Sequence, residues 1–130
     1  LKINSEIPSK EKKLTISKII VLINGNLVLY DKTPYMLDDM LIVPLRETLN
    51  KLGIKVEWDD LNKTITASSD NITIQLSIGS NLIKVNNTEI VSVIPTEIIN
   101  GITMVPLRLL LESFGKSVVW HHDENLVIVI

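Results

Sequence analysis

The stretch IVPLRETLNKLGIKVEW, which spans Ile42–Trp58, is written a second time as MVPLRLLLESFGKSVVW over Met104–Trp120. Sliding residues 24–68 onto 86–130 requires no gap and gives nine identities in 45 positions. The chain has only two Arg and two Trp, and each pair falls on equivalent positions. Chance rarely matches the scarcest residues of a chain, so the sequence predicts a duplicated unit.

Each copy of the phrase predicts a short helix followed by a strand. A proline stands at the first helical position, where its missing N–H costs nothing, and apolar residues then recur at i, i+3, i+4 and i+7. A glycine ends each helix as a left-handed cap, and apolar residues alternate up to the tryptophan. The residues to which we assign structural roles are Pro44, Arg46, Gly53 and Trp58 in the first copy and Pro106, Arg108, Gly115 and Trp120 in the second.

The remaining patterns favour antiparallel strands. Asn24-Gly25 between two apolar runs is a hairpin signal, because a type I′ turn needs positive φ at both central residues. The segment Ile72–Ile78 alternates apolar and polar residues, and we expect Leu126–Ile130 to be paired inside a sheet, because an exposed edge needs cover. The predicted fold class is α+β: two tandem repeats, each a mainly antiparallel β-sheet packed around one short α-helix.

The predicted domain organisation has three parts. Residues 1–18 are polar and read as a linker or N-terminal arm, residues 19–80 as the first repeat unit, and residues 81–130 as the second. We expect the two units to pack closely, because the connection from Ser68 to Asn81 is itself a predicted strand. The sequence leaves open whether the units form separate cores or share strands.

Composition excludes several classes of function. Net charge is −2 and the basic residues are scattered, so we expect no nucleic-acid partner. The run Ile19–Ile23 is far shorter than the ~20 residues that span a bilayer, so we expect no membrane insertion. The absence of cysteine excludes disulfides and a thiol nucleophile. Because the chain opens with Leu1 rather than Met, we expect it to be a processed or excised piece of a longer protein.

The repeated residues resemble a known family. VPLRETLNKLGIKVEWDD and MVPLRLLLESFGKSVVWHHD, together with ING and VNN upstream, are similar to the copper amine oxidase N-terminal domain, a stalk-like module of secreted proteins from Gram-positive bacteria. The resemblance covers about residues 19–130, in two tandem copies. It implies a five-stranded antiparallel sheet twisted around a helix. The second copy departs from the pattern at Asn87, Phe114 and His121-His122.

The resemblance implies a non-catalytic, extracellular or cell-surface module that is structural or binding, with a cell-wall polymer, a protein or a second copy of the chain as partner. One alternative is a cell-wall carbohydrate or peptidoglycan binder that uses the Pro-bearing loops Asp31–Asp39 and Ile94–Gly101. The other is an accessory or inhibitory domain of a secreted enzyme. The catalytic domain of copper amine oxidases uses three His on copper and a Tyr-derived quinone, whereas this chain has two His and two Tyr. We therefore predict no enzymatic activity and no cofactor.

Three groups of residues admit a functional interpretation beside a structural one. The two arginines lie in a first helical turn, next to the positive end of the helix dipole, so we expect each guanidinium to reach a loop carbonyl or a carboxylate; an anionic ligand is the alternative. We expect both tryptophans in the core with their indole N–H on backbone acceptors, and sugar platforms are the alternative. His121, His122 and Asp123 are the only metal candidates, and we predict no metal there, because adjacent His point to different sides.

Overall fold

The computed structural model describes residues 19–130, and the predicted linker at 1–18 lies outside them. The helical elements are α3 (Leu45–Lys51), α4 (Leu107–Ser113) and the 3-10 turn η1 (His122–Glu124). The strands are β1 (Ile20–Ile23), β2 (Asn26–Leu27), β3 (Tyr35–Leu37), β4 (Met40–Pro44), β5 (Lys55–Asp59), β6 (Thr64–Ser68), β7 (Thr73–Ser77), β8 (Leu82–Val85), β9 (Thr88–Val91), β10 (Glu97–Ile99), β11 (Ile102–Pro106), β12 (Val118–His121) and β13 (Leu126–Val129).

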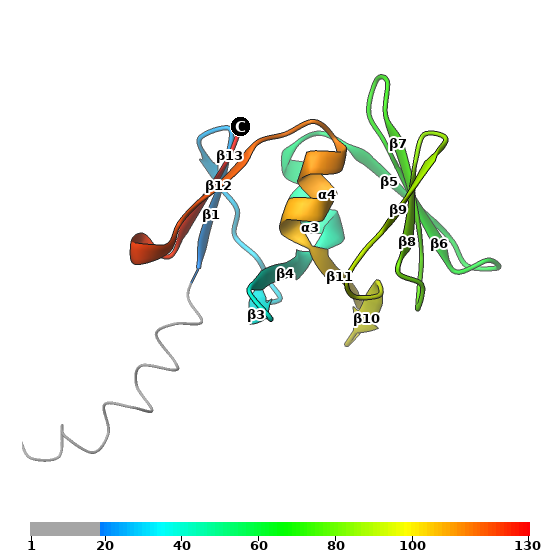
Figure 1. Cartoon of the computed structure of the whole chain (residues 1–130), viewed down its shortest axis with the longest axis horizontal. Helices are drawn as coiled ribbons and strands as arrows, with labels where there is room; N and C mark the ends of the chain where they lie inside the picture. Colours follow the sequence, from blue (N-terminus) through cyan, green and yellow to red (C-terminus); the bar gives the residue numbers. More distant parts are fainter. Residues whose placement is uncertain (1–18) are drawn as a thin grey trace, which may run out of the picture.

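The strands form three sheets around a central pair of helices. Their orders are β12-β13-β1-β2, β10-β11-β4-β3 and β5-β6-β7-β8-β9. Figure 1 shows α3 and α4 between the first and the last of these sheets, with the β3, β4, β10 and β11 strands below them. Strand pairing is antiparallel except between β1 and β13, which run parallel. The predicted α+β class, mostly strands with two short helices, is confirmed.

The sheets do not follow the predicted boundary at residue 80. The last hairpin of the chain, β12-β13, pairs with the first, β1-β2, and β5-β6 joins β8-β9 through β7. Each outer sheet therefore contains strands from both sides of residue 80. The prediction that each repeat carries its own sheet around its own helix is wrong. Sequence periodicity fixes which residues form a strand, but it says nothing about which strand lies beside it.

The two helices begin where two equivalent strands meet. β4 and β11 each run five residues into a proline, 62 positions apart, and a seven-residue helix follows each. The two strands pair with each other in the register Pro44 to Met104, Val43 to Val105 and Ile42 to Pro106. Because Val43 and Val105 are themselves 62 positions apart, the register is symmetric about this pair.

The helix boundaries follow the predicted residues closely. Pro44 has φ −63° and ψ 127°, so it is the extended residue before the helix rather than its first helical residue, and Pro106 has the same conformation. This corrects the sequence prediction by one position, since each proline also ends a strand. Gly53 and Gly115 directly follow the last helical turn with φ of 72° and 78°, as predicted for left-handed caps.

The core lies between the helices and the inner faces of the sheets. The predicted stripe of α3 is buried at Leu45 and Leu49, and the predicted alternation in β7 buries Ile74 and Leu76. The prediction that Leu126–Ile130 pairs inside a sheet is confirmed, because β13 lies between β12 and β1. None of the helices within residues 19–130 is long and apolar enough to cross a membrane.

Removal of a core side chain at the helix should destabilise the whole fold. We expect Leu49→Ala to lower the free energy of unfolding by about 3 kcal/mol, because Leu49 is fully buried and its loss leaves a cavity. Leu61→Ala is the control, since Leu61 is 88% exposed, and it should change stability by less than about 0.5 kcal/mol. Urea unfolding of both variants measures the difference, and equal midpoints would contradict the core assignment.

Candidate functional site

Two grooves open beside the two helices. Groove 1 has a volume of about 500 Å³ and lies beside α3. It is lined by Asp31, Pro44, Leu45, Arg46, Glu47, Val56, Trp58, Ile65, Ile98, Gly101, Ile102 and Thr103. Groove 2 has a volume of about 760 Å³ and lies beside α4. It is lined by Met36, Asp39, Met40, Leu41, Val91, Ser92, Val93, Pro106, Leu107, Arg108, Leu109, Glu112, Val118, Trp120, His122 and Val127.

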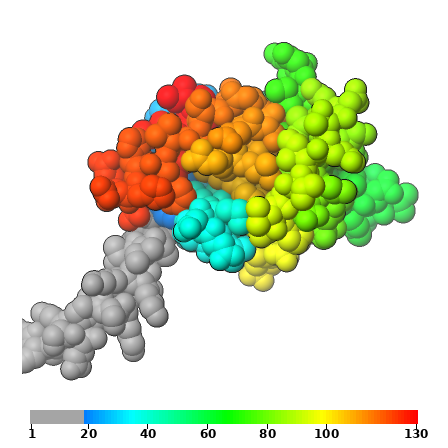
Figure 2. Space-filling model, viewed as in Figure 1, coloured from blue at the N-terminus to red at the C-terminus, as the bar shows by residue number. Residues whose placement is uncertain are grey.

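The grooves are built alike. Every residue that lines groove 1 has its counterpart, 62 positions away, in the lining of groove 2. Each groove takes its helix and its tryptophan strand from one side of residue 80 and a short hairpin from the other, either β10-β11 or β3-β4. Figure 2 shows the face that carries groove 2, with α4 (orange) between β12 (red), β9 (yellow-green) and β3 (cyan).

The arginines tie each helix to the strand that follows it. Arg46 Nη1 lies 3.4 Å from the carbonyl oxygen of Val56 in β5 and donates to it. Arg108 Nη1 donates to the carbonyl oxygen of Val118 in β12 at 3.0 Å, and also contacts the Glu112 carboxylate at 3.1 Å. The sequence led us to expect a loop carbonyl or a carboxylate; both carbonyls lie in strands instead, and Arg108 also contacts a carboxylate. These contacts also leave both guanidinium groups in the wall of a groove.

Trp58 is not in the core, and the prediction that it is buried is wrong. Its side chain is 39% exposed and lines groove 1. Trp58 lies on the inner face of the sheet, opposite the buried Ile65, but β5 is the edge strand, where the groove opens. The indole Nε1 donates to Asp60 Oδ1 at 3.4 Å, a side-chain rather than a backbone acceptor. The Lys63 ammonium lies 6.0 Å from the ring centroid, and its hydrogen bond to Asp60 is the main cause of a lowered Asp60 pKa.

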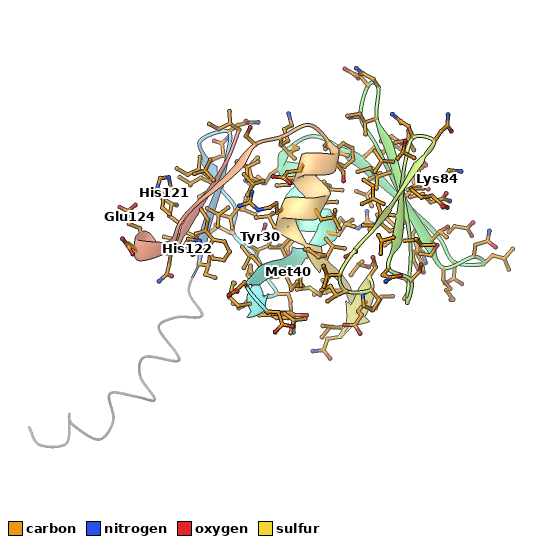
Figure 3. All side chains as sticks on the ribbon, in the orientation of Figure 1. Tyr30, Met40, Lys84, His121, His122 and Glu124 are labelled. Atoms are coloured by element: carbon orange, nitrogen blue, oxygen red, sulfur yellow. The ribbon has the colours of Figure 1, made fainter. Side chains whose placement is uncertain are left out.

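Trp120 is half-buried in groove 2 and differs from Trp58 in two ways. Its Nε1 is buried and has no hydrogen-bond partner within the described residues, so the expected backbone acceptor is not there. An unpaired buried donor costs about 1–3 kcal/mol. The imidazole of His122 is stacked on the indole, with ring centroids 4.6 Å apart and the planes 11° from parallel. Figure 3 shows His122 and its neighbours His121 and Glu124 at the end of β12.

Three positions that are polar in groove 1 are apolar in groove 2. The carboxylates of Asp31 and Glu47 and the hydroxyl of Thr103 line groove 1 beside Trp58. At the equivalent positions, groove 2 has Val93, Leu109 and Leu41. The sequence pointed to the loops Asp31–Asp39 and Ile94–Gly101 as one alternative site. Asp31 of the first loop lines groove 1 together with Ile98 and Gly101 of the second, whereas Met36 and Asp39 of the first loop line groove 2. Glu47 was missed, because a charged residue in a first helical turn gives no signal of a ligand.

A buried polar chain holds the Asp31 end of groove 1 against α3. The Thr48 hydroxyl donates to the carbonyl oxygen of Pro44 at 2.7 Å, so the Tyr30 hydroxyl, also 2.7 Å away, donates to Thr48. The backbone N–H of Asp31 donates to Glu47 Oε2 at 3.1 Å. Burial raises the pKa of Tyr30 to about 12. Tyr30 is thus a neutral hydrogen-bond donor that positions the chain where it enters the groove.

The described residues do not fit a metal centre. Within residues 19–130, no three His, Cys, Asp or Glu side chains are grouped so that they could hold an ion. His122, one of the three candidates from the sequence, contacts Trp120 instead. A copper site with three histidine ligands also needs more histidines than the two in the whole chain.

Comparison with known proteins gives one family. The family model described as the copper amine oxidase N-terminal domain matches residues 22–129. The match is a single span that includes both grooves, rather than two matches of half that length. No curated protein matches the chain.

The buried hydroxyl of Tyr30 should make stability depend on alkaline pH. Its pKa is about 12 in the folded chain and 10.0 in the unfolded one, so the unfolded state loses its proton first. The contribution is therefore fully present below about pH 10 and is lost as the pH rises to about 12, for a total of roughly 3 kcal/mol. Urea unfolding of the wild type and Tyr30→Phe across this range measures it. Parallel pH profiles for the two proteins would contradict the assignment.

Proposed function

The chain belongs to the copper amine oxidase N-terminal domain family, and from this premise we propose that it is an extracellular binding module that holds a neutral carbohydrate in groove 1. The family's N-terminal domain is in general non-catalytic. The single observation that carries the proposal is the exposed indole of Trp58, which lies in a groove together with the side chains of Asp31, Arg46 and Glu47.

The shape and polarity of groove 1 suit a sugar ring. A pyranose has an apolar face of C–H groups and an edge of hydroxyls, which match a flat aromatic surface bordered by acceptors and donors. Trp58, Ile98 and Ile102 supply the apolar wall of the groove. Carboxylates accept hydrogen bonds from hydroxyls, and the Thr103 hydroxyl both donates and accepts. The Trp58 ring lies opposite Ile65 in the β5-β6 pair and keeps 39% of its surface exposed, so a ligand in the groove can reach it.

The charges in groove 1 favour a neutral ligand over an anionic one. Two carboxylates, Asp31 and Glu47, face a single cation, Arg46. Arg46 also already donates to the Val56 carbonyl oxygen. A phosphate or a uronic acid would be repelled by the excess negative charge, whereas sugar hydroxyls would find acceptors. This argues against a teichoic-acid-like polymer and for the neutral glycan strands of a cell wall.

The surrounding biology is part of the same proposal. We place the module on a secreted or surface protein of a Gram-positive bacterium, where a neutral cell-wall glycan is accessible. We also propose that residues 19–80 and 81–130 descend from one duplicated unit. Support comes from the repeated phrase in the sequence and from elements that recur 62 positions apart, including the two helices. The two units then exchanged hairpins to form the three sheets.

Removal of the Trp58 ring should abolish binding to neutral oligosaccharides. We expect isothermal titration with a glucose tetrasaccharide to show at least tenfold weaker binding for Trp58→Ala, because the stacking surface is lost. Trp58→Phe should retain part of the affinity. Leu61→Ala is the matched control, since Leu61 is exposed just beyond β5 but does not line the groove.

Two results would overturn the proposal. One is unchanged affinity in Trp58→Ala, which would remove the stacking platform from the binding site. The other is binding of inorganic phosphate in preference to every neutral oligosaccharide, which would show that Arg46 rather than Trp58 decides the ligand.

A further inference from the structure

Groove 2 is built from the same elements as groove 1, but one residue difference changes what its tryptophan contacts. The position equivalent to Asp60 is occupied by His122, 62 residues later. Asp60 accepts from the edge of the Trp58 ring and leaves the indole exposed in its groove. His122 instead stacks on the face of the Trp120 ring, with centroids 4.6 Å apart. The imidazole thus sits where a flat ligand would lie on the other tryptophan.

The indole N–H of Trp120 needs an acceptor that its surroundings lack. The atom is buried and unpaired within the described residues, although the side chain lines groove 2. Buried polar groups are almost always satisfied, so an unpaired donor in the wall of a groove calls for an explanation. Arg108 adds further N–H donors, and Glu112 is already engaged with it. Groove 2 therefore combines these donors with acceptors at Asp39, Ser92 and Glu112, but none of these acceptors bonds the Trp120 indole.

The walls around these donors are apolar and adaptable. Met36, Met40 and Leu41 come from the β3-β4 hairpin, and Val91 and Val93 lie along and after β9. Methionine side chains adjust their shape to small apolar groups. A ligand for groove 2 should thus combine a flat ring, a methyl group and a carbonyl acceptor. An N-acetylated amino sugar has all three, since the acetamido group carries both the methyl and the carbonyl.

We propose that groove 2 is a second carbohydrate site, selective for N-acetylhexosamines, which His122 holds closed by stacking on Trp120. The ring class of the ligand rests on the function proposed for groove 1, whereas the acetamido selectivity rests on groove 2 itself. Opening requires the imidazole to leave the indole, so that a sugar ring takes its place and the acetamido carbonyl accepts from Nε1–H. His122 is exposed and begins the short turn η1, so its side chain has room to rotate.

The two indole N–H groups of the chain make the test direct. With only two tryptophans, a ¹⁵N-labelled sample gives two indole signals, which Trp58→Phe and Trp120→Phe assign. We expect N-acetylglucosamine tetrasaccharide to move the Trp120 signal of His122→Ala at concentrations roughly three- to tenfold lower than in the wild type, because one aromatic stack no longer competes. Glucose tetrasaccharide should move it at least about tenfold less readily, because it lacks the acetamido carbonyl.

Two variants serve as controls. His122→Phe keeps a ring in place, so its Trp120 signal should respond no more readily than that of the wild type. His121→Ala removes the neighbouring histidine, which does not line the groove, and should behave as the wild type. Unchanged backbone amide spectra in these variants establish that the fold is intact.

The outcomes separate this inference from the proposed function. If the Trp120 signal of His122→Ala does not respond to the N-acetylated sugar, or responds equally in the wild type, the inference is overturned, whatever Trp58 does. If it responds as expected while the Trp58 signal never moves in any variant, groove 1 is not a carbohydrate site and the inference about groove 2 stands.

Discussion

The pairing of Val43 with Val105 is the constraint on which the other features of the structure depend. These residues are equivalent in the two halves of the sequence, they are fully buried, and they lie opposite each other where β4 meets β11. A proline directly follows each of these valines and ends its strand, and the helix begins at the next residue. The two helices therefore start from the centre of the molecule. Both tryptophan strands then run outward into different sheets, and each groove is closed by a hairpin from the opposite half.

The same constraint explains why the sheets mix the two halves. If β4 and β11 are neighbours, β5-β6 leaves α3 on one side of the molecule and β12-β13 leaves α4 on the other. The first hairpin, β1-β2, then lies beside β13, and the corresponding hairpin β8-β9 lies in the sheet of β6. The one departure from this plan is β7, which lies between β6 and β8, whereas β13 contacts β1 directly. β7 belongs to the connection between the halves, which has to cross that sheet.

The sequence predicted the parts that local patterns determine. The helix stripe at Leu45 and Leu49, the left-handed Gly53 and the alternation around Ile74 depend on period and backbone conformation alone. The exposure of Trp58 depends on β5 being the edge strand of its sheet and on the groove beside it, and the alternation along β5 looks the same for an edge strand as for an interior one. The grooves could not be predicted from the sequence for a related reason. Their walls join residues from both halves, and no repeat shows that hairpins have been exchanged.

Parallel contact between β1 and β13 also determines how the fold would carry mechanical load. The backbone N–H of Ile20 donates to the carbonyl oxygen of Asn125, and the backbone N–H of Asn24 donates to the carbonyl oxygen of Val129, both at 2.9 Å. Because the strands run in the same direction, tension applied at Ile19 and at Ile130 pulls along the strands and across their bonds. Such shear loads every bond of the pair together, so they must rupture at once instead of opening singly from one end. Force that passes through this domain from Ile19 to Ile130 would be resisted by β1 and β13.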